Sequence, residues 1–97
     1  MFKELDPILH SQLRLAIVSL LIGLEEAEFV YLKEKTNVTA GNLSLQLDKL
    51  NKAGYIILKK GFKGKYPVTT CKITPKGNKA FQDYVDSLRT YIRIDSI

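Results

Sequence analysis

The amino-acid sequence predicts an α+β fold built by one domain. Apolar residues recur at helical spacing before residue 53, change to an alternating, β-branched pattern over residues 55–74, and return to helical spacing after residue 75. A chain of 97 residues has room for one modest hydrophobic core. We therefore expect one domain over residues 1–97, with a three-helix core, a two-stranded hairpin and a long C-terminal helix.

The first helix is expected to begin at Asp6-Pro7. Aspartate caps free amides at a helix start, and proline fits the first turn, where its missing N–H is not needed. The apolar residues of segment 9–24 then lie on one helical face. Gly23 and the acidic pair Glu25-Glu26 are expected to end this helix.

A helix-turn-helix is predicted over residues 29–53, because two helices separated by a three-residue turn have the spacing of that motif. The first is expected over residues 29–36 and ends at Asn37, which tolerates a left-handed backbone. Thr39 has the N-cap position of the second helix, over residues 40–52. Three leucines form the buried stripe of that helix: Leu43, Leu47 and Leu50.

A β-hairpin is predicted over residues 55–74, with a basic loop at residues 62–66. Thr74-Pro75 then repeats the capping signal and opens a last helix over residues 75–93. The apolar seam of this helix has coiled-coil-like spacing and needs a partner, which we expect to be a second copy of the chain. The expected dimerisation residues are Phe81, Tyr84, Val85, Leu88, Tyr91 and Ile92.

The positive charge of the chain is concentrated in its middle. The formal net charge is +5, but residues 35–79 contain ten lysines against the one acidic residue Asp48. Such a segment offers a polyanion a positive patch, which makes nucleic acid a candidate partner.

Enzyme chemistry has little support in the sequence. One cysteine and one histidine cannot form an internal disulfide or a four-ligand zinc site, and no metal-binding, nucleophile-elbow or glycine-rich phosphate motif is present. We expect no enzyme activity, no cofactor and no metal. His10 is expected to pack or to lie at an interface, and Cys71 to be a buried strand residue, or a redox sensor if it is exposed with a lowered pKa.

The expected location is the cytoplasm, without a membrane partner. A lone cysteine suits a reducing compartment. The apolar stretch over residues 15–24 is shorter than the about 20 residues that a membrane span needs, and Glu4 and Asp6 disfavour a signal peptide.

The polar face of the predicted helix 40–52 has the composition of a DNA recognition helix. Asparagine and glutamine side chains can pair with adenine, an outward leucine can contact a thymine methyl group, and hydroxyl and lysine groups can bind phosphate. The hairpin lysines surround a glycine-bearing tip, as expected of a loop that contacts the DNA backbone. The candidate DNA-binding residues are Thr39, Asn42, Ser44, Leu45, Gln46, Lys49, Lys60, Lys63 and Lys65.

Two segments, TNVTAGNLSLQLDKLNKAGYI and KKGFKGKYPVTTCKITPKGNKAF, resemble the small winged-helix transcriptional regulators related to the MarR and ArsR groups. The similarity is greatest to the short, stand-alone type that dimerises through its terminal helices. It implies a homodimer whose recognition helices enter the major groove and whose β-wings touch the flanking backbone. By position, Asn42, Ser44, Leu45 and Gln46 would be groove contacts, and Lys63 and Lys65 wing contacts. Members of these groups often carry histidine at the position of Gln46.

The expected function is sequence-specific binding of double-stranded DNA at a pseudo-palindromic operator by a dimeric transcriptional regulator. Two alternatives stay open, because one fold can serve several functions. In the first, the chain is a winged-helix protein-interaction module whose lysines only aid solubility. In the second, it is a regulator that senses a small molecule at the dimer interface, near His10 or Tyr84.

Overall fold

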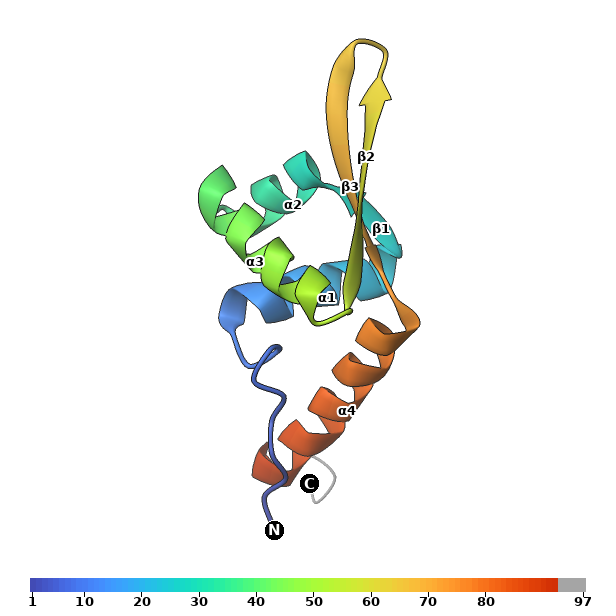
Figure 1. Cartoon of the computed structure of the whole chain (residues 1–97). Helices are drawn as coiled ribbons and strands as arrows, with labels where there is room; N and C mark the ends of the chain where they lie inside the picture. Colours follow the sequence, from blue (N-terminus) through green and yellow to red (C-terminus); the bar gives the residue numbers. More distant parts are fainter. Residues whose placement is uncertain (93–97) are drawn as a thin grey trace.

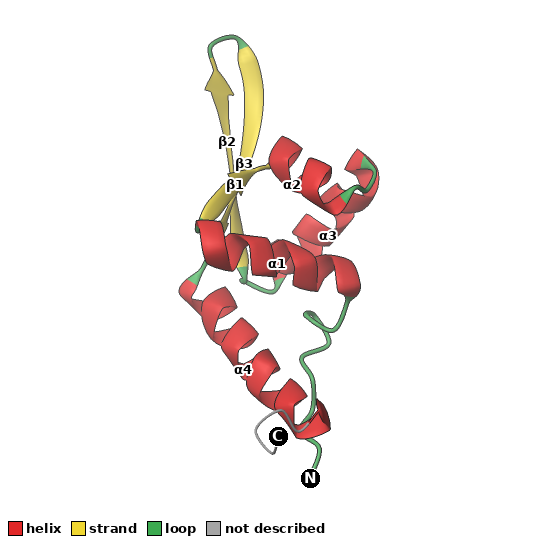
Figure 2. Cartoon of the chain, turned by 180° about the vertical axis from the view of Figure 1, so that it is seen from behind, coloured by secondary structure: helices red, strands yellow, loops and turns green. Residues whose placement is uncertain are grey.

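The computed structural model describes residues 1–92 and confirms the predicted order of helices and hairpin (Figure 1). Its elements are α1 (Gln12–Leu24), β1 (Glu26–Glu28), α2 (Phe29–Thr36), α3 (Ala40–Lys52), β2 (Ile56–Lys63), β3 (Tyr66–Ile73) and α4 (Pro75–Ile92). The molecule is elongated, 54 × 25 × 22 Å, because the β2–β3 hairpin and α4 extend in opposite directions from the body formed by α1, α2 and α3 (Figures 1 and 2). Residue 93, the predicted end of the last helix, lies outside the described residues.

The predicted two-stranded hairpin is confirmed as β2–β3, and a third strand, which the sequence did not predict, extends its sheet to three antiparallel strands in the order β1-β3-β2. The additional strand β1 pairs with β3 from Glu26↔Lys72 to Glu28↔Thr70. It is three residues long and contains no β-branched or aromatic residue, so the sequence carries no strand signal there. The strand conformation of β1 comes from tertiary contact. The chain leaves α1 directly beside β3, so residues 26–28 can pair with that strand.

The β2–β3 hairpin has the predicted extent, but its strand pairing continues further toward the tip and its turn is tighter than expected. Its strands pair as far as Lys63↔Tyr66, which leaves Gly64 and Lys65 as the loop. The predicted five-residue loop is therefore mostly strand. Gly64 has φ +62°, and a positive φ at the first loop position is what a type II′ turn requires.

The core forms where α1, α3 and the base of the sheet meet. The predicted leucine stripe of α3 is confirmed, because Leu43, Leu47 and Leu50 are all buried. Its fully or nearly fully buried side chains are Leu9, Ile17, Val18, Leu21, Leu32, Leu43, Leu47, Leu50, Ile56, Cys71, Ile73 and Tyr84. None of the described helices is long and apolar enough to cross a membrane.

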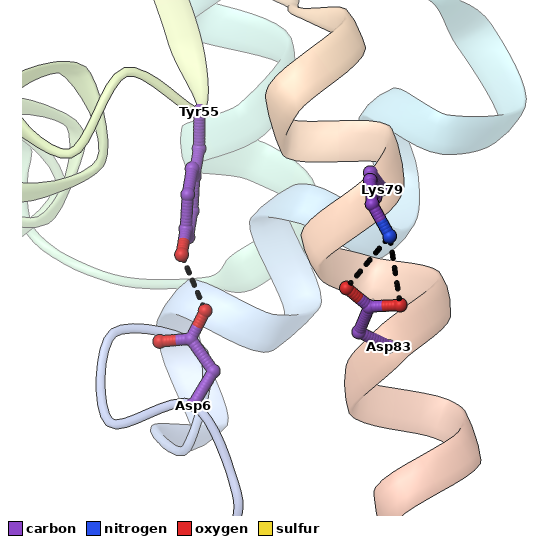
Figure 3. Close-up of polar contacts among 4 residues, drawn as sticks. All are labelled: Asp6, Tyr55, Lys79 and Asp83. Carbon is purple, nitrogen blue, oxygen red and sulfur yellow. Dashed lines mark hydrogen bonds and ion pairs between the residues drawn. The ribbon is translucent and has the colours of Figure 1, made fainter.

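The start of α1 corrects the expectation from Asp6-Pro7. Residues 7–9 form a turn, and α1 begins at Gln12 with Ser11 as its N-cap. Asp6 has other partners: its Oδ1 accepts a hydrogen bond from the Ile8 amide at 2.8 Å, and its Oδ2 accepts one from the Tyr55 hydroxyl (Figure 3). Burial and the Asp6 carboxylate raise the pKa of Tyr55 to about 12. The hydrogen bond from Tyr55 to Asp6 therefore holds the N-terminal segment against the residue that precedes β2.

The same segment continues along α4. The Lys3 amide donates to Thr90 Oγ1 at 3.1 Å, and the Tyr91 hydroxyl donates to the Lys3 carbonyl at 2.8 Å. Residues before α1 therefore cover one face of α4 for much of its length.

An exposed part of α4 carries an ion pair of its own. Lys79 Nζ lies 3.2 Å from a carboxylate oxygen of Asp83, one helical turn further along (Figure 3).

Cys71 does not meet the condition for a redox sensor. Its side chain is completely buried on β3, and burial raises the pKa of its thiol to about 11. We expect the native protein to react with a thiol reagent at pH 8 only through unfolding, because the reactive thiolate is both scarce and enclosed. Release of the chromophore from an aromatic disulfide reagent, measured with and without urea, tests this. Native modification at the rate of a free cysteine would contradict it.

Candidate nucleic-acid interface

The helix-turn-helix geometry presents one polar face of α3 to solvent. Asn37 adopts the left-handed conformation at φ 54° and ends α2, and the Thr39 hydroxyl caps α3 by accepting from the Asn42 amide at 3.1 Å. The predicted DNA-binding residues of this segment that lie exposed are Thr39, Asn42, Ser44, Leu45 and Lys49. Leu45 is 53% exposed, so the helix carries an apolar contact in the middle of its polar face.

Gln46 lies on the flank of that face and is half-buried. Its Oε1 accepts a hydrogen bond from Arg14 Nη1 at 2.6 Å, and its Nε2 donates to Asn42 Oδ1 at 3.1 Å. Both functional atoms of Gln46 therefore have partners within the chain. Arg14 was not among the predicted site residues; it is the only charged residue of the largely apolar helix α1, and that is the signal that could have revealed it.

The wing, defined here as the β2–β3 hairpin beyond the core (residues 59–70), presents its lysines on two faces. Because successive strand residues point to opposite faces, Lys60 shares a face with Leu58 and with the buried Ile56. This face looks toward α3, and the two elements border a pocket of about 370 Å³. The pocket is lined by Phe29, Ser44, Leu47, Asp48, Leu58, Lys60 and Thr69. The structure thus brings Ser44 of α3 and Lys60 of the wing together.

Lys63 lies on the opposite face of the wing and has an internal partner. Its Nζ is 2.6 Å from a carboxylate oxygen of Glu28, although the Lys63 side chain remains 70% exposed. Glu28 precedes α2 and makes no capping hydrogen bond with its side chain, so its carboxylate is available for this pair. Lys65 is exposed in the turn.

The predicted dimerisation residues of α4 fall into two groups. Tyr84 is only 6% exposed, and its hydroxyl lies 3.2 Å from His10 Nδ1; Tyr91 stacks on Phe2 with ring centroids 4.8 Å apart. Both tyrosines pack against the N-terminal segment of their own chain. The second group lies on an adjacent stripe of the helix, and consists of the half-buried Phe81, Val85 and Leu88 and the exposed Ile92.

Comparisons with known proteins agree with this architecture. Residues 13–92 match the family described as "Winged helix DNA-binding domain". The chain is 48% identical over 79 residues to an uncharacterised protein of Methanocaldococcus jannaschii, an alignment that covers 80% of this chain and 85% of that protein.

Solved structures of transcriptional regulators have the same fold. A transcriptional regulator homologue from Pyrococcus horikoshii superposes with a TM-score of 0.83 at 27% identity, covering 89% of this chain and 85% of that chain. The regulator BldR of Sulfolobus solfataricus superposes with a TM-score of 0.70 at 24% identity, covering 84% of this chain and 58% of that chain. The predicted fold and the resemblance to winged-helix regulators are confirmed. The chain belongs to the winged helix DNA-binding domain family.

Proposed function

We propose that the protein is a homodimeric transcriptional regulator that binds a pseudo-palindromic site in double-stranded DNA. The observation that carries this proposal is the placement of Ser44 on α3 and Lys60 on the wing around one pocket. When a recognition helix and a basic wing border the same pocket, the helix can contact the major groove while the wing contacts the adjoining phosphate backbone.

The roles of the contact residues follow from their places. Asn42 and Leu45 are exposed on α3 and face base edges, while Lys49 lies one turn further along the helix and meets phosphate. Lys60 and Lys65 contact the backbone from the wing, together with Lys63 once it leaves Glu28. The Thr39 and Ser44 hydroxyls supply further phosphate contacts. In this proposal Gln46 supports Asn42 in place of the predicted groove contact of its own, because its amide is engaged by Arg14 and Asn42.

The dimer forms through α4. Phe81, Val85, Leu88 and Ile92 make an apolar stripe beside the face that the N-terminal segment covers. Pairing two such stripes buries apolar surface that one chain leaves in water. Two-fold symmetry then places two recognition helices on half-sites about 10 base pairs apart.

Selection from random duplex DNA tests the proposal. The full chain is incubated with a pool of random duplexes, and the bound fraction is sequenced; we expect enrichment of an inverted repeat with half-sites about 10 base pairs apart. Sedimentation of the protein with and without the enriched duplex gives the number of chains per site. Binding without enrichment would contradict sequence-specific recognition and favour the protein-interaction alternative.

Removing the Glu28 carboxylate is expected to strengthen DNA binding. Glu28→Gln frees Lys63 for phosphate and removes one negative charge from the wing side, so Kd for the enriched duplex should fall about three- to tenfold at low salt. Glu34→Gln, which removes an equal charge from an exposed position of α2, is the matched control. Equal effects of the two variants would show that net charge, rather than release of Lys63, is responsible.

One observation favours the sensing alternative as a second candidate function. A pocket of about 300 Å³ lies between the N-terminal segment and α4, lined by residues that include Asp6, Tyr55 and Tyr84. A ligand bound there would touch both the dimerisation helix and Tyr55, the residue that precedes β2. A screen for small molecules that raise the melting temperature tests this candidate, because selective binding to the native state stabilises it.

A further inference from the structure

A chain of side-chain hydrogen bonds connects α1 to the exposed face of α3. It runs from Arg14 through Gln46 to Asn42, with N···O distances of 2.6 and 3.1 Å. Arg14 is itself held in place, because its Nε donates to the Ile8 carbonyl at 2.6 Å and its Nη2 lies 3.5 Å from the Pro7 carbonyl. We call these three side chains the Arg14 relay.

The direction of each hydrogen bond in the relay is fixed by chemistry. A guanidinium group has only donors, so the atom of Gln46 that faces Arg14 must be the amide oxygen. The Gln46 nitrogen is then left as a donor, and the atom of Asn42 that faces it must be an oxygen. One positive charge on α1 thus determines which way round two amide groups on α3 are held.

This orientation determines what Asn42 offers to DNA. Gln46 lies one turn toward the C-terminal end of α3, so it draws Asn42 Oδ1 toward that end. The Asn42 NH₂ group is left facing away, toward the helix N-terminus whose residues contact base edges in this class of motif. Asn42 therefore presents two donors, while its oxygen is turned toward Gln46 with one of its two acceptor positions in use.

We propose that Arg14, acting through Gln46, makes Asn42 select guanine over adenine at its base pair; the inference rests on the proposed function. Guanine shows two acceptors, N7 and O6, in the major groove, and an NH₂ group can donate to both. Adenine shows one acceptor and one donor, so its bidentate pairing needs the asparagine oxygen to face the base beside the NH₂ group, and the relay turns that oxygen toward Gln46 instead. Asn42 is then the specificity-determining residue, and Arg14 and Gln46 are positioning residues.

The test measures base preference rather than affinity alone. Each base pair of the enriched half-site is changed in turn, and Kd is measured for the wild type and for three variants: Asn42→Ala, Arg14→Met and Gln46→Glu. Asn42→Ala identifies the base pair that Asn42 reads. At that pair we expect the wild type to prefer guanine over adenine about tenfold, and Arg14→Met and Gln46→Glu each to reduce the preference below about twofold.

The two positioning variants release Asn42 in different ways. Arg14→Met removes the donor that orients Gln46, whereas Gln46→Glu keeps an acceptor for Arg14 and removes the donor to Asn42. If Arg14→Met does not fold, as judged by circular dichroism, Gln46→Glu therefore still decides the question. Arg89→Met, on an exposed site of α4, is the control for loss of one positive charge and should keep the tenfold preference.

Three results would overturn the inference. The first is an unchanged guanine preference in both positioning variants. The second is an effect of Gln46→Glu at a different base pair from that of Asn42→Ala, which would show that Gln46 reads a base directly. The third is failure of the wild type to enrich any duplex, which would overturn the proposed function as well and so is distinguishable from the other two.

Discussion

Charge reversal at two wing lysines, Lys60→Glu with Lys65→Glu, is expected to weaken binding to the enriched duplex by about 100-fold or more at 0.1 M salt. Both side chains are exposed, and neither has an acidic partner in the structure's ion pairs among the described residues. In the proposed dimer, the change removes four phosphate contacts and adds four repulsive charges. The slope of log K against log salt concentration should also become shallower by about 4.

A second double variant separates wing contacts from net charge. Lys72→Glu with Lys79→Glu makes the same change in charge at the base of the sheet and on α4, away from the wing tip. We expect a much smaller loss of affinity for this variant, measured by fluorescence anisotropy on the same duplex. Equal losses for both pairs would show that the wing makes no specific backbone contact.

Gly77→Ala is expected to destabilise the fold by about 2 kcal/mol. A Cβ at this position would lie 2.3 Å from the Tyr55 carbonyl oxygen and 2.8 Å from Ile73 Cδ1. Overpacking of this kind costs up to about 3 kcal/mol, and the better helix propensity of alanine recovers about 1 kcal/mol. The first turn of α4 is held against that carbonyl by Thr74, whose amide donates to Tyr55 O at 3.1 Å, so the backbone has little freedom to withdraw.

Gly23→Ala is the matched control for this prediction. A Cβ on Gly23, near the end of α1, meets no atom within 4 Å. This variant is expected to be as stable as the wild type or more stable, by up to about 1 kcal/mol. Urea unfolding followed by circular dichroism compares the two. Equal stability of the two alanine variants would contradict the close packing of α4 on the base of β2.

The elements with strong local signals were predictable from the sequence. Thr39 and the leucines of α3 have the spacing of a capped, amphipathic helix, and the structure confirms both the cap and the buried stripe. Asn37 ends α2 in the left-handed conformation, as its side chain favours. In these segments local preference and tertiary packing agree, which is why pattern alone is sufficient.

The features that were not predictable depend on contacts between distant residues. Asp6-Pro7 has the sequence of a helix start, but Tyr55, 49 residues away, takes the Asp6 carboxylate as its hydrogen-bond acceptor. Strand β1 exists because β3 lies beside it. Tyr84 fits the helical seam by spacing, yet the N-terminal segment covers it.

The candidate site shows the same division. Exposure of Asn42, Leu45 and Lys49 follows from helical periodicity. The partners of Gln46 and Lys63 do not, because Arg14 and Glu28 lie 32 and 35 positions away in the sequence. Residue type therefore indicates which side chains can contact DNA, and the fold determines which of them are already engaged.

The salt dependence of duplex binding tests most directly whether this protein binds DNA through the backbone contacts proposed for its wing and for α3. Fluorescence anisotropy of the enriched duplex is titrated with the wild-type protein at 50 and 200 mM salt. If the dimer neutralises about six to ten phosphates, affinity should fall by about 10³–10⁵-fold between the two conditions. An affinity that stays constant across this range would contradict backbone binding by the wing and by α3.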